Sequence, residues 1–117
     1  MPENADTSAD AFQHLVRILE EAVQAGADCL ELDWEDRELV VYQYFGHTGV
    51  GAVSIPEELQ EAVLREIVKR AKLTRKPTGT MLLTLLGNEY EVFVKEYDSF
   101  GESAFTLRLN KARKRRK

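Results

Sequence analysis

The sequence predicts an α+β domain, with a mostly antiparallel, curved sheet of about six strands and two amphipathic helices packed mainly on one face. Residues 12–23 and 59–71 each carry apolar side chains at the three-to-four-residue spacing of a helix. Each stretch is followed by three short runs rich in β-branched and aromatic residues, separated by turn residues. The expected order is therefore α-β-β-β-α-β-β-β, and short connections make neighbouring strands antiparallel.

The first helix is expected to begin near Ser8, because Ser8 or Thr7 can cap it and Asp10 follows in the first turn. Residues 1–7 precede that cap and are expected to be a disordered leader. Gly26 suits the left-handed conformation in which helices often end. The apolar face of this helix consists of Phe12, Leu15, Val16, Leu19, Ala22 and Val23.

Three strands are expected after this helix. Cys29–Trp34 alternates apolar and acidic residues, which is typical of a strand with one buried and one solvated face. Asp36-Arg37 predicts a turn, and Leu39–Phe45 is rich in residues that favour strands. A glycine-rich segment then precedes a short third strand at Val50–Ile55.

The second helix is expected to have Pro56 in its first turn and Ser54 as its cap. Its buried stripe consists of Leu59, Val63, Leu64, Ile67, Val68 and Ala71. A loop at 76–79 follows. Hairpin turns at Gly87-Asn88 and Ser99–Gly101 then divide the rest of the chain into strands at Thr80–Leu86, Glu89–Tyr97 and Ser103–Leu109.

Length and composition favour one domain, at residues 8–110, followed by a basic, disordered tail at 111–117. The net charge of −4 conceals an asymmetry, because six of the last seven residues are Lys or Arg. The rest of the chain is strongly acidic. The single cysteine, Cys29, excludes an intramolecular disulfide and favours a reduced, cytoplasmic setting. No apolar run approaches the roughly 20 residues of a membrane span.

Five short motifs follow one another in a fixed order. Residues 26–33 read G-A-D-C-L-E-L-D, residues 41–46 read V-Y-Q-Y-F-G, and residues 66–69 read E-I-V-K. P-T-G-T follows at 77–80, and T-L-R-L follows Gly101-Glu102. In this order and spacing the chain resembles the N-terminal, PAS-like domain of type II secretion and type IV pilus assembly ATPases. The resemblance runs from Phe12 to Asn110 and lacks the motor core.

The departures from that family concern its charged residues. The family pattern R-Y-R-x-D-G places two arginines and an aspartate where this chain has Val41, Gln43 and Phe45. The family's first motif, G-A-S-D-I-H-I-E, has a histidine where this chain has Glu31. In the motor proteins the basic residues face a nucleotide. The phosphate-binding loop G-x-x-x-x-G-K-[ST] is absent, and the glycine-rich stretch 46–51 lacks its lysine. The resemblance therefore implies a module that is not an enzyme and holds no cofactor.

Residues capable of other chemistry are few. His14 and His47 are the only histidines, and no short spacing supplies the three or four ligands of a metal site. Cys29 follows Asp28, whose carboxylate disfavours a thiolate, so a structural role is expected. The acidic residues between 28 and 38 are interpreted mainly as the solvated face of a strand, with a basic partner surface as the alternative.

Protein partners are expected to bind through aromatic and charged residues. Tyr42 and Tyr44 share one strand face, and exposed aromatics are typical anchors of interfaces; packing in the core is the alternative. The second helix and its exit carry a basic patch whose candidate contact residues are Arg65, Lys69, Arg70 and Lys72. The tail adds Arg113, Arg115 and Arg116.

The functional prediction is a non-enzymatic protein-interaction, assembly or regulatory module, whose partner is a secretion or pilus component or a second copy. One alternative is a nucleic-acid accessory protein that uses the tail and the second-helix patch. Another is a PAS-like sensor with a small ligand in its core. The tail itself has three further interpretations: a solubilising segment, a ligand of an acidic partner, or a ligand of the acidic strand in a neighbouring copy.

Overall fold

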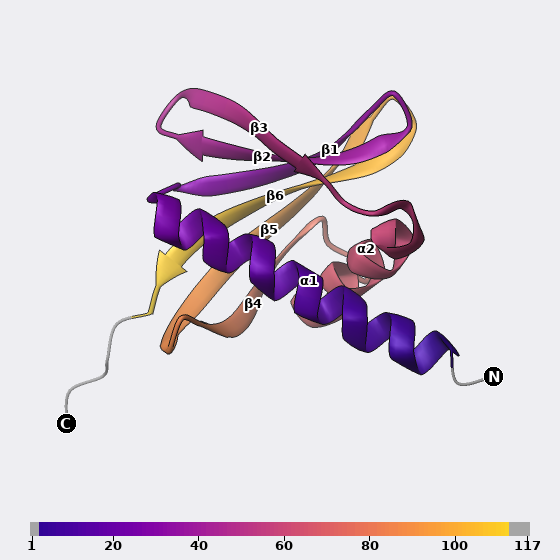
Figure 1. The fold of residues 1–117 in the computed structure, drawn as a ribbon, viewed down its shortest axis with the longest axis horizontal. Helices are drawn as coiled ribbons and strands as arrows, with labels where there is room; N and C mark the ends of the chain where they lie inside the picture. The colour runs from indigo at the N-terminus through magenta and orange to yellow at the C-terminus, as the bar shows by residue number, and fades with distance from the viewer. Residues whose placement is uncertain (1–2, 113–117) are drawn as a thin grey trace.

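The predicted order of helices and strands is confirmed in the computed structural model, which describes residues 3–112 (Figure 1). The protein is an α+β domain with two helices and an antiparallel sheet. The elements are α1 (Glu3–Ala25), β1 (Cys29–Glu35), β2 (Glu38–Phe45), β3 (Thr48–Ser54), α2 (Glu57–Ala71), β4 (Thr78–Leu85), β5 (Asn88–Ser99) and β6 (Glu102–Lys111).

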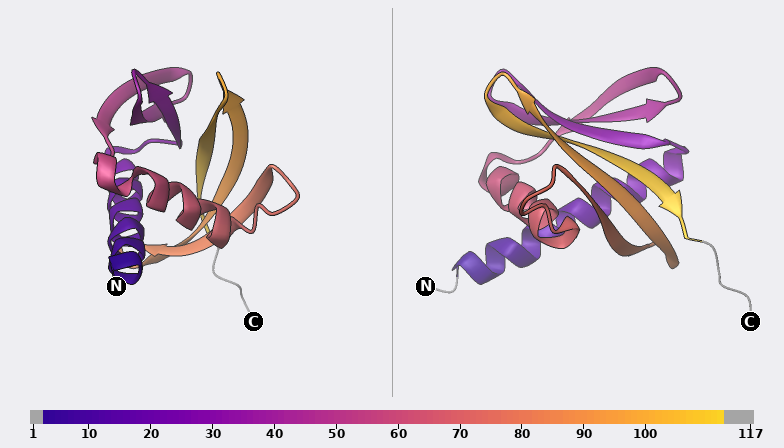
Figure 2. Two further views of the ribbon diagram at one scale, coloured as in Figure 1. Left: turned by 90° about the vertical axis from the view of Figure 1, so that its right-hand side faces the viewer. Right: turned by 180° about the vertical axis from the view of Figure 1, so that it is seen from behind.

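The six strands form one sheet in the order β3-β2-β1-β6-β5-β4. Two three-stranded meanders therefore meet where β1 pairs with β6. This central pairing is short, because only Cys29–Leu32 pairs with Phe105–Arg108, whereas β5 and β6 pair from Tyr90 to Ser99. The sheet is strongly twisted and curves around the two helices, as the side view in Figure 2 shows.

Both helices pack on the same face of the sheet, which gives the two-layer arrangement that the sequence predicts. Alternate strand residues such as Leu30, Leu32 and Leu107 are buried against the apolar faces of the helices. Their partners on the helices include Leu15, Leu19, Val63 and Ile67. The other strand residues lie on the opposite face, and no described helix covers that face (Figure 2).

A buried carboxylate joins the two helices. Glu66 of α2 is only 4% exposed, and its side chain accepts hydrogen bonds from Ser8 Oγ of α1 at 2.6 Å and from Arg70 Nε at 2.9 Å. Lys69 Nζ lies 3.6 Å from the same carboxylate. The guanidinium of Arg70 also stacks on Phe12 of α1, 3.6 Å from the ring centroid. The buried carboxylate thus has two hydrogen-bond donors and a nearby lysine, all of them more exposed than Glu66 itself.

The end of α2 lies against β4 at a glycine. A Cβ atom added to Gly79 would lie 2.1 Å from the carbonyl oxygen of Ala71, so only glycine lets the strand pass this close to the helix. Lys72, in the left-handed conformation, follows Ala71 and ends the helix there. Gly79 therefore sets the distance between α2 and the sheet.

Several predicted boundaries are wrong. α1 begins at Glu3, so residues 3–7 belong to a helix and not to a disordered leader; no glycine or proline interrupts residues 3–25, and the helix extends past Ser8. Pro56, not Ser54, is the N-cap residue of α2, because Ser54 ends β3 and donates its hydroxyl to Glu38.

The strand ends differ in smaller ways. The turn between β4 and β5 lies at Leu86-Gly87, one residue earlier than predicted, and both residues have positive φ angles. β6 continues through Lys111, so Lys111 lies in the sheet and not in the tail. The tail residues 113–117 lie outside the described part of the chain. Among the described residues no helix is long and apolar enough to cross a membrane.

Candidate functional site

The open face of the sheet brings together aromatic and acidic side chains from three strands. Glu31, Asp33 and Glu35 of β1 alternate with the buried residues of that strand and therefore point away from the helices. Tyr42 and Tyr44 of β2 and Tyr97 of β5 lie on the same side and hydrogen-bond to these carboxylates. We call this surface the open face and define it by these six residues.

Glu31 is the central acceptor of the open face. Tyr44 donates its hydroxyl to Glu31 Oε1 at 3.0 Å, and Tyr97 donates to Oε2 at 2.8 Å. Tyr44 comes from the N-terminal meander and Tyr97 from the C-terminal one, so Glu31 connects the two halves of the sheet across the short β1–β6 pairing. Tyr42 donates in the same way to Glu35 at 2.9 Å.

These contacts keep the phenols protonated. Burial, followed by the hydrogen bond to Glu31, raises the pKa of Tyr97 far above its usual value. The hydrogen bond to Glu31 is the main cause that raises the pKa of Tyr44, and the bond to Glu35 does the same for Tyr42. At neutral pH all three hydroxyls are therefore donors with fixed acceptors, and their rings are held in place.

Two glycines of β3 lie under two of these rings, and one of them, Gly49, is required to make room for the ring of Tyr44. A Cβ atom on Gly49 would lie 2.7 Å from the ring of Tyr44, and one on Gly51 would lie 3.4 Å from the ring of Tyr42. The rings therefore lie over the two glycine positions of β3, an arrangement that covers glycines in edge strands. The glycine-rich segment near residue 50 thus serves the packing of tyrosines.

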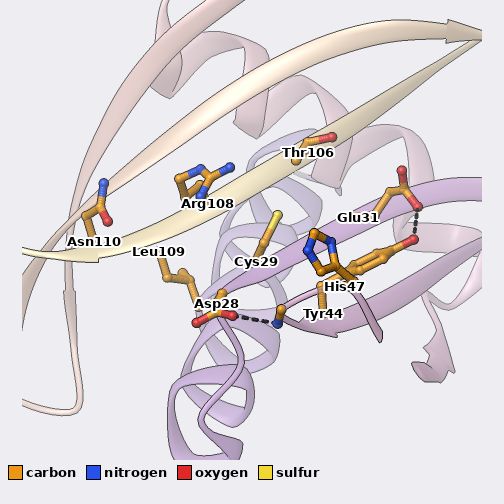
Figure 3. Close-up of a pocket in the computed structure, with 10 residues that line it drawn as sticks. Asp28, Cys29, Glu31, Tyr44, His47, Thr106, Arg108, Leu109 and Asn110 are labelled. Carbon is orange, nitrogen blue, oxygen red and sulfur yellow. Dashed lines mark hydrogen bonds between the residues drawn. The ribbon is translucent and has the colours of Figure 1, made fainter. Parts of the chain in front are cut away.

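A shallow hollow of about 620 Å³ lies at one end of the open face (Figure 3). Asp28, Glu31 and Tyr44 line it from the N-terminal meander, and Thr106, Arg108 and Asn110 line it from β6. Asp28 Oδ2 accepts a hydrogen bond from the backbone N–H of Gly46 at 2.7 Å, which fixes the β2–β3 turn beside the hollow. The hollow is a surface feature and lies outside the apolar core.

Of the residues suited to catalysis or metal binding, Cys29 and His47 line the hollow beside Glu31, whereas His14 lies on α1 (Figure 3). No three His, Cys, Asp or Glu side chains in the searched, described part of the chain could hold a metal ion. Burial, followed by the charges of Glu31 and Asp28 against that of Arg108, raises the pKa of the Cys29 thiol, so Cys29 is a poor nucleophile. Burial, and then Arg17, lowers the pKa of His14, whose Nε2 has no hydrogen-bond partner among the described residues.

The structure separates the residues of the predicted basic patch. Arg65 faces solvent and lies 3.7 Å from Glu61, whereas Arg70 points toward α1 and contacts Glu66. Lys69 also lies near Glu66, and Lys72 ends the helix. Most of this patch is therefore paired within α2. The predicted contact residues Arg113, Arg115 and Arg116 lie outside the described residues.

Sequence reasoning left the facing of Tyr42 and Tyr44 open, and it did not identify Glu31 as their common neighbour with Tyr97. The alternation of Leu30, Glu31 and Leu32 indicates which face Glu31 occupies. Nothing in the sequence indicates that Tyr97, 66 positions away, reaches the same carboxylate. No family model matches the chain, and no curated protein matches it either.

We expect Tyr97→Phe to lower the free energy of unfolding by about 1–2 kcal/mol, because it removes one hydrogen bond to a carboxylate and leaves the ring in place. Urea denaturation followed by circular dichroism measures this loss. Tyr90→Phe is the matched control, since Tyr90 is also on β5 and half-buried but makes no side-chain hydrogen bond among the described residues. Equal urea midpoints for the two variants would contradict the view that the hydrogen bond from Tyr97 to Glu31 stabilises the fold.

Proposed function

We propose that this chain is a non-catalytic interaction or assembly module that binds a protein partner through the open face of its sheet. The observation that carries this proposal is that both helices pack on one side, while the other side presents tyrosines whose hydroxyls are already bonded. Such rings lose little conformational entropy when a partner binds, and they contribute apolar contact area.

Exposed apolar side chains extend this surface onto the C-terminal meander. Phe93 of β5 is 43% exposed, and Leu82 of β4 is 76% exposed. Thr80 pairs with Phe93 and Leu82 with Glu91, so Phe93 and Leu82 are diagonal neighbours on this side of the sheet. A surface with aromatic anchors, apolar neighbours and a charged rim has the composition of a protein interface.

The order of the five motifs supports a relationship to the N-terminal domains of secretion and pilus assembly ATPases. On this proposal the partner is a cytoplasmic component of such a system or a second copy. Glu31, at the family's histidine position, binds tyrosines in this chain and would repel a phosphate group. The replacement of cations therefore supports protein recognition rather than nucleotide binding.

Nucleic acid is the weaker alternative. Arg65, Lys69 and Arg70 each lie within 3.7 Å of a glutamate, so these cations are partly neutralised within their own helix. Any nucleic-acid binding would then depend on the tail.

Site-specific photo-crosslinking tests the proposed function. A benzophenone amino acid placed at Tyr42 or Phe93 is expected to form light-dependent adducts with a protein in host extract. The same group at Gln13, an exposed residue of α1, serves as the matched control. Adducts formed only from Gln13, or from none of the three positions, would refute the proposed binding surface.

A further inference from the structure

The carboxylates of β1 form an uncompensated row. Asp28, Glu31, Asp33 and Glu35 follow one another along one strand and the turn that precedes it. The ion pairs among the described residues all lie on α2, so no described cation lies within salt-bridge distance of this row. Arg108 of β6 pairs with Cys29 and lines the hollow with Asp28 and Glu31 but forms no ion pair with them, and Lys95 lies farther away, on β5. The open face therefore favours a cationic ligand.

The tyrosines make this face more specific than a set of acidic groups. Tyr42, Tyr44 and Tyr97 are half-buried, and their hydroxyls point to Glu31 and Glu35, so each ring lies next to a carboxylate. A guanidinium group stacks on such a ring and donates to the neighbouring carboxylate at the same time. Arginine therefore suits the open face better than lysine.

The chain itself contains a segment with this chemistry. Residues 113–117 read R-K-R-R-K, five consecutive cations. They follow β6, whose last residues border the hollow, where the backbone N–H of Leu109 donates to the carbonyl of Asp28 at 3.0 Å. The basic segment thus leaves the domain at the end of the sheet where the acidic row begins.

Within one chain this segment can reach Asp28 at the start of the row, because Asp28 lies beside Leu109, but it is too short to reach Asp33 and Glu35 at the far end. Thr106 pairs with Glu31, so Glu31 lies six residues back from Ala112, which corresponds to about 20 Å along the strand. Five extended residues span at most about 17 Å, and the chain would first have to reverse direction. Asp33 and Glu35 lie still farther away. A second copy has no such restriction.

We propose that two copies of this chain associate by exchanging these segments, so that residues 113–117 of each copy bind the open face of the other. The arrangement is two-fold symmetric and closes on itself, since both copies give a tail and receive one. It rests on the proposed function, because it names a second copy as one partner of that face. The contacts are largely between charges at the surface, so salt weakens them.

Sedimentation equilibrium of the full chain tests this association. We expect a dimer at about 0.05 M salt and at least a tenfold weaker dimer at about 0.5 M, where the screening length is shorter. Replacing all five residues 113–117 by glutamine is expected to give a monomer at both salt concentrations. A dimer that survives these substitutions would overturn the proposal.

A matched control separates the tail from the overall charge. Glutamine at five cations outside the tail changes the net charge equally, and this variant is expected to dimerise like the unmodified protein. The five positions are Arg17, Arg65, Lys72, Arg75 and Lys76. Loss of the dimer in this control alone would assign the association to net charge and would also overturn the proposal.

A charge exchange identifies the surface that receives the tail. One variant carries Asp33→Lys and Glu35→Lys. The other carries Arg113→Glu, Arg115→Glu and Arg116→Glu. Each is expected to be monomeric alone, and their mixture is expected to form a heterodimer. If the mixture stays monomeric although both variants show native circular dichroism, the open face does not receive the tail.

A peptide titration decides the question if the first variant does not fold. The peptide K-A-R-K-R-R-K is added to the tail-neutralised chain, and amide shifts are expected on β1 and β2. Shifts confined to α2, or none, would overturn the proposal. If crosslinks from Tyr42 to other proteins persist in that case, only the exchange fails; if they are absent as well, the proposed function fails with it.

Discussion

Replacing Gly79 by alanine is expected to lower the free energy of unfolding by about 3 kcal/mol, because a backbone atom occupies the place of the added methyl group. The added Cβ would lie 2.1 Å from the carbonyl oxygen of Ala71 and 3.0 Å from a methyl group of Leu73. Neither α2 nor β4 can yield easily, because both pack on the core through Ile67 and Met81. Urea denaturation of the purified variant measures the loss.

Gly51→Ala is the control for this prediction. Its Cβ would meet only the ring of Tyr42, at 3.4 Å, and Gly51 does not have a positive φ angle. Alanine should therefore be tolerated at this strand position, with a change below about 1 kcal/mol. If Gly79→Ala unfolds at the same urea concentration as Gly51→Ala, the close approach of α2 to β4 does not limit stability.

Glu66→Gln is expected to cost about 2 kcal/mol at neutral pH. Glutamine keeps the shape and an acceptor for Ser8, but it removes the charge that Arg70 and Lys69 contact. The arginine is partly exposed, so its loss of a partner is less severe than for a fully buried cation. Glu61→Gln, at an exposed pair on the same helix, is the control and should leave stability unchanged within error.

The pH dependence of the same variant gives an independent test. Burial alone would raise the pKa of Glu66, but the hydrogen bonds from Ser8 and Arg70 and the charges of Lys69 and Arg70 together hold it below its usual value. A carboxylate whose pKa is lower in the folded than in the unfolded chain stabilises the fold above the unfolded value of about 4.3. This contribution is lost as the pH falls through the folded-state pKa.

The difference in stability between the unmodified protein and Glu66→Gln should therefore be largest near neutral pH and shrink under acidic conditions. Urea denaturation of both proteins between about pH 7 and about pH 3 measures it. A difference that stays constant over this range would show that the glutamine substitution acts through packing and not through charge.

The local pattern of the sequence predicted most of the fold. The 3.6-residue stripe of Leu15 and Leu19 identified α1, and the alternation of Leu30 and Leu32 with acidic residues identified β1. Gly26 ends α1 with a φ of 85°, as expected. The predicted start of α1 was wrong because no glycine or proline lies between Glu3 and Ser8 to end the helix there, so the helix continues to Glu3.

Long-range contacts were not predictable in the same way. Cys29 pairs with Arg108 where the two three-stranded meanders meet. The local sequence of each meander predicts its own turns and strands but does not indicate which strand of one meander pairs with the other. The hydrogen bond from Ser8 to Glu66 spans 58 positions, and glutamate in a helix ordinarily indicates an exposed side. The local sequence does not indicate the close approach of Gly79 to α2 either, because a glycine two residues after Pro77 is also typical of a turn.

The candidate site was predicted in part. The sequence offered Tyr42 and Tyr44 of β2 as interface residues, with packing in the core as the alternative, and the alternation of β1 indicated that Glu31 and Asp33 face away from the buried residues. The hydrogen bond from Tyr97 to Glu31 depends on the strand order. β6 lies between β5 and β1, and its residue opposite Tyr97 is Ala104, whose side chain is small. Only the three-dimensional arrangement reveals that one glutamate serves both halves of the sheet.

The strand order also constrains how the protein is made. β1 is the first strand to leave the ribosome, yet its second neighbour, β6, is the last. Until β6 has been synthesised, β1 therefore presents an unpaired edge that can pair with a strand of another chain. Because its native partner is the last strand of the sheet to be made, the centre of the sheet closes only after all six strands exist, through contacts that are far apart in the sequence.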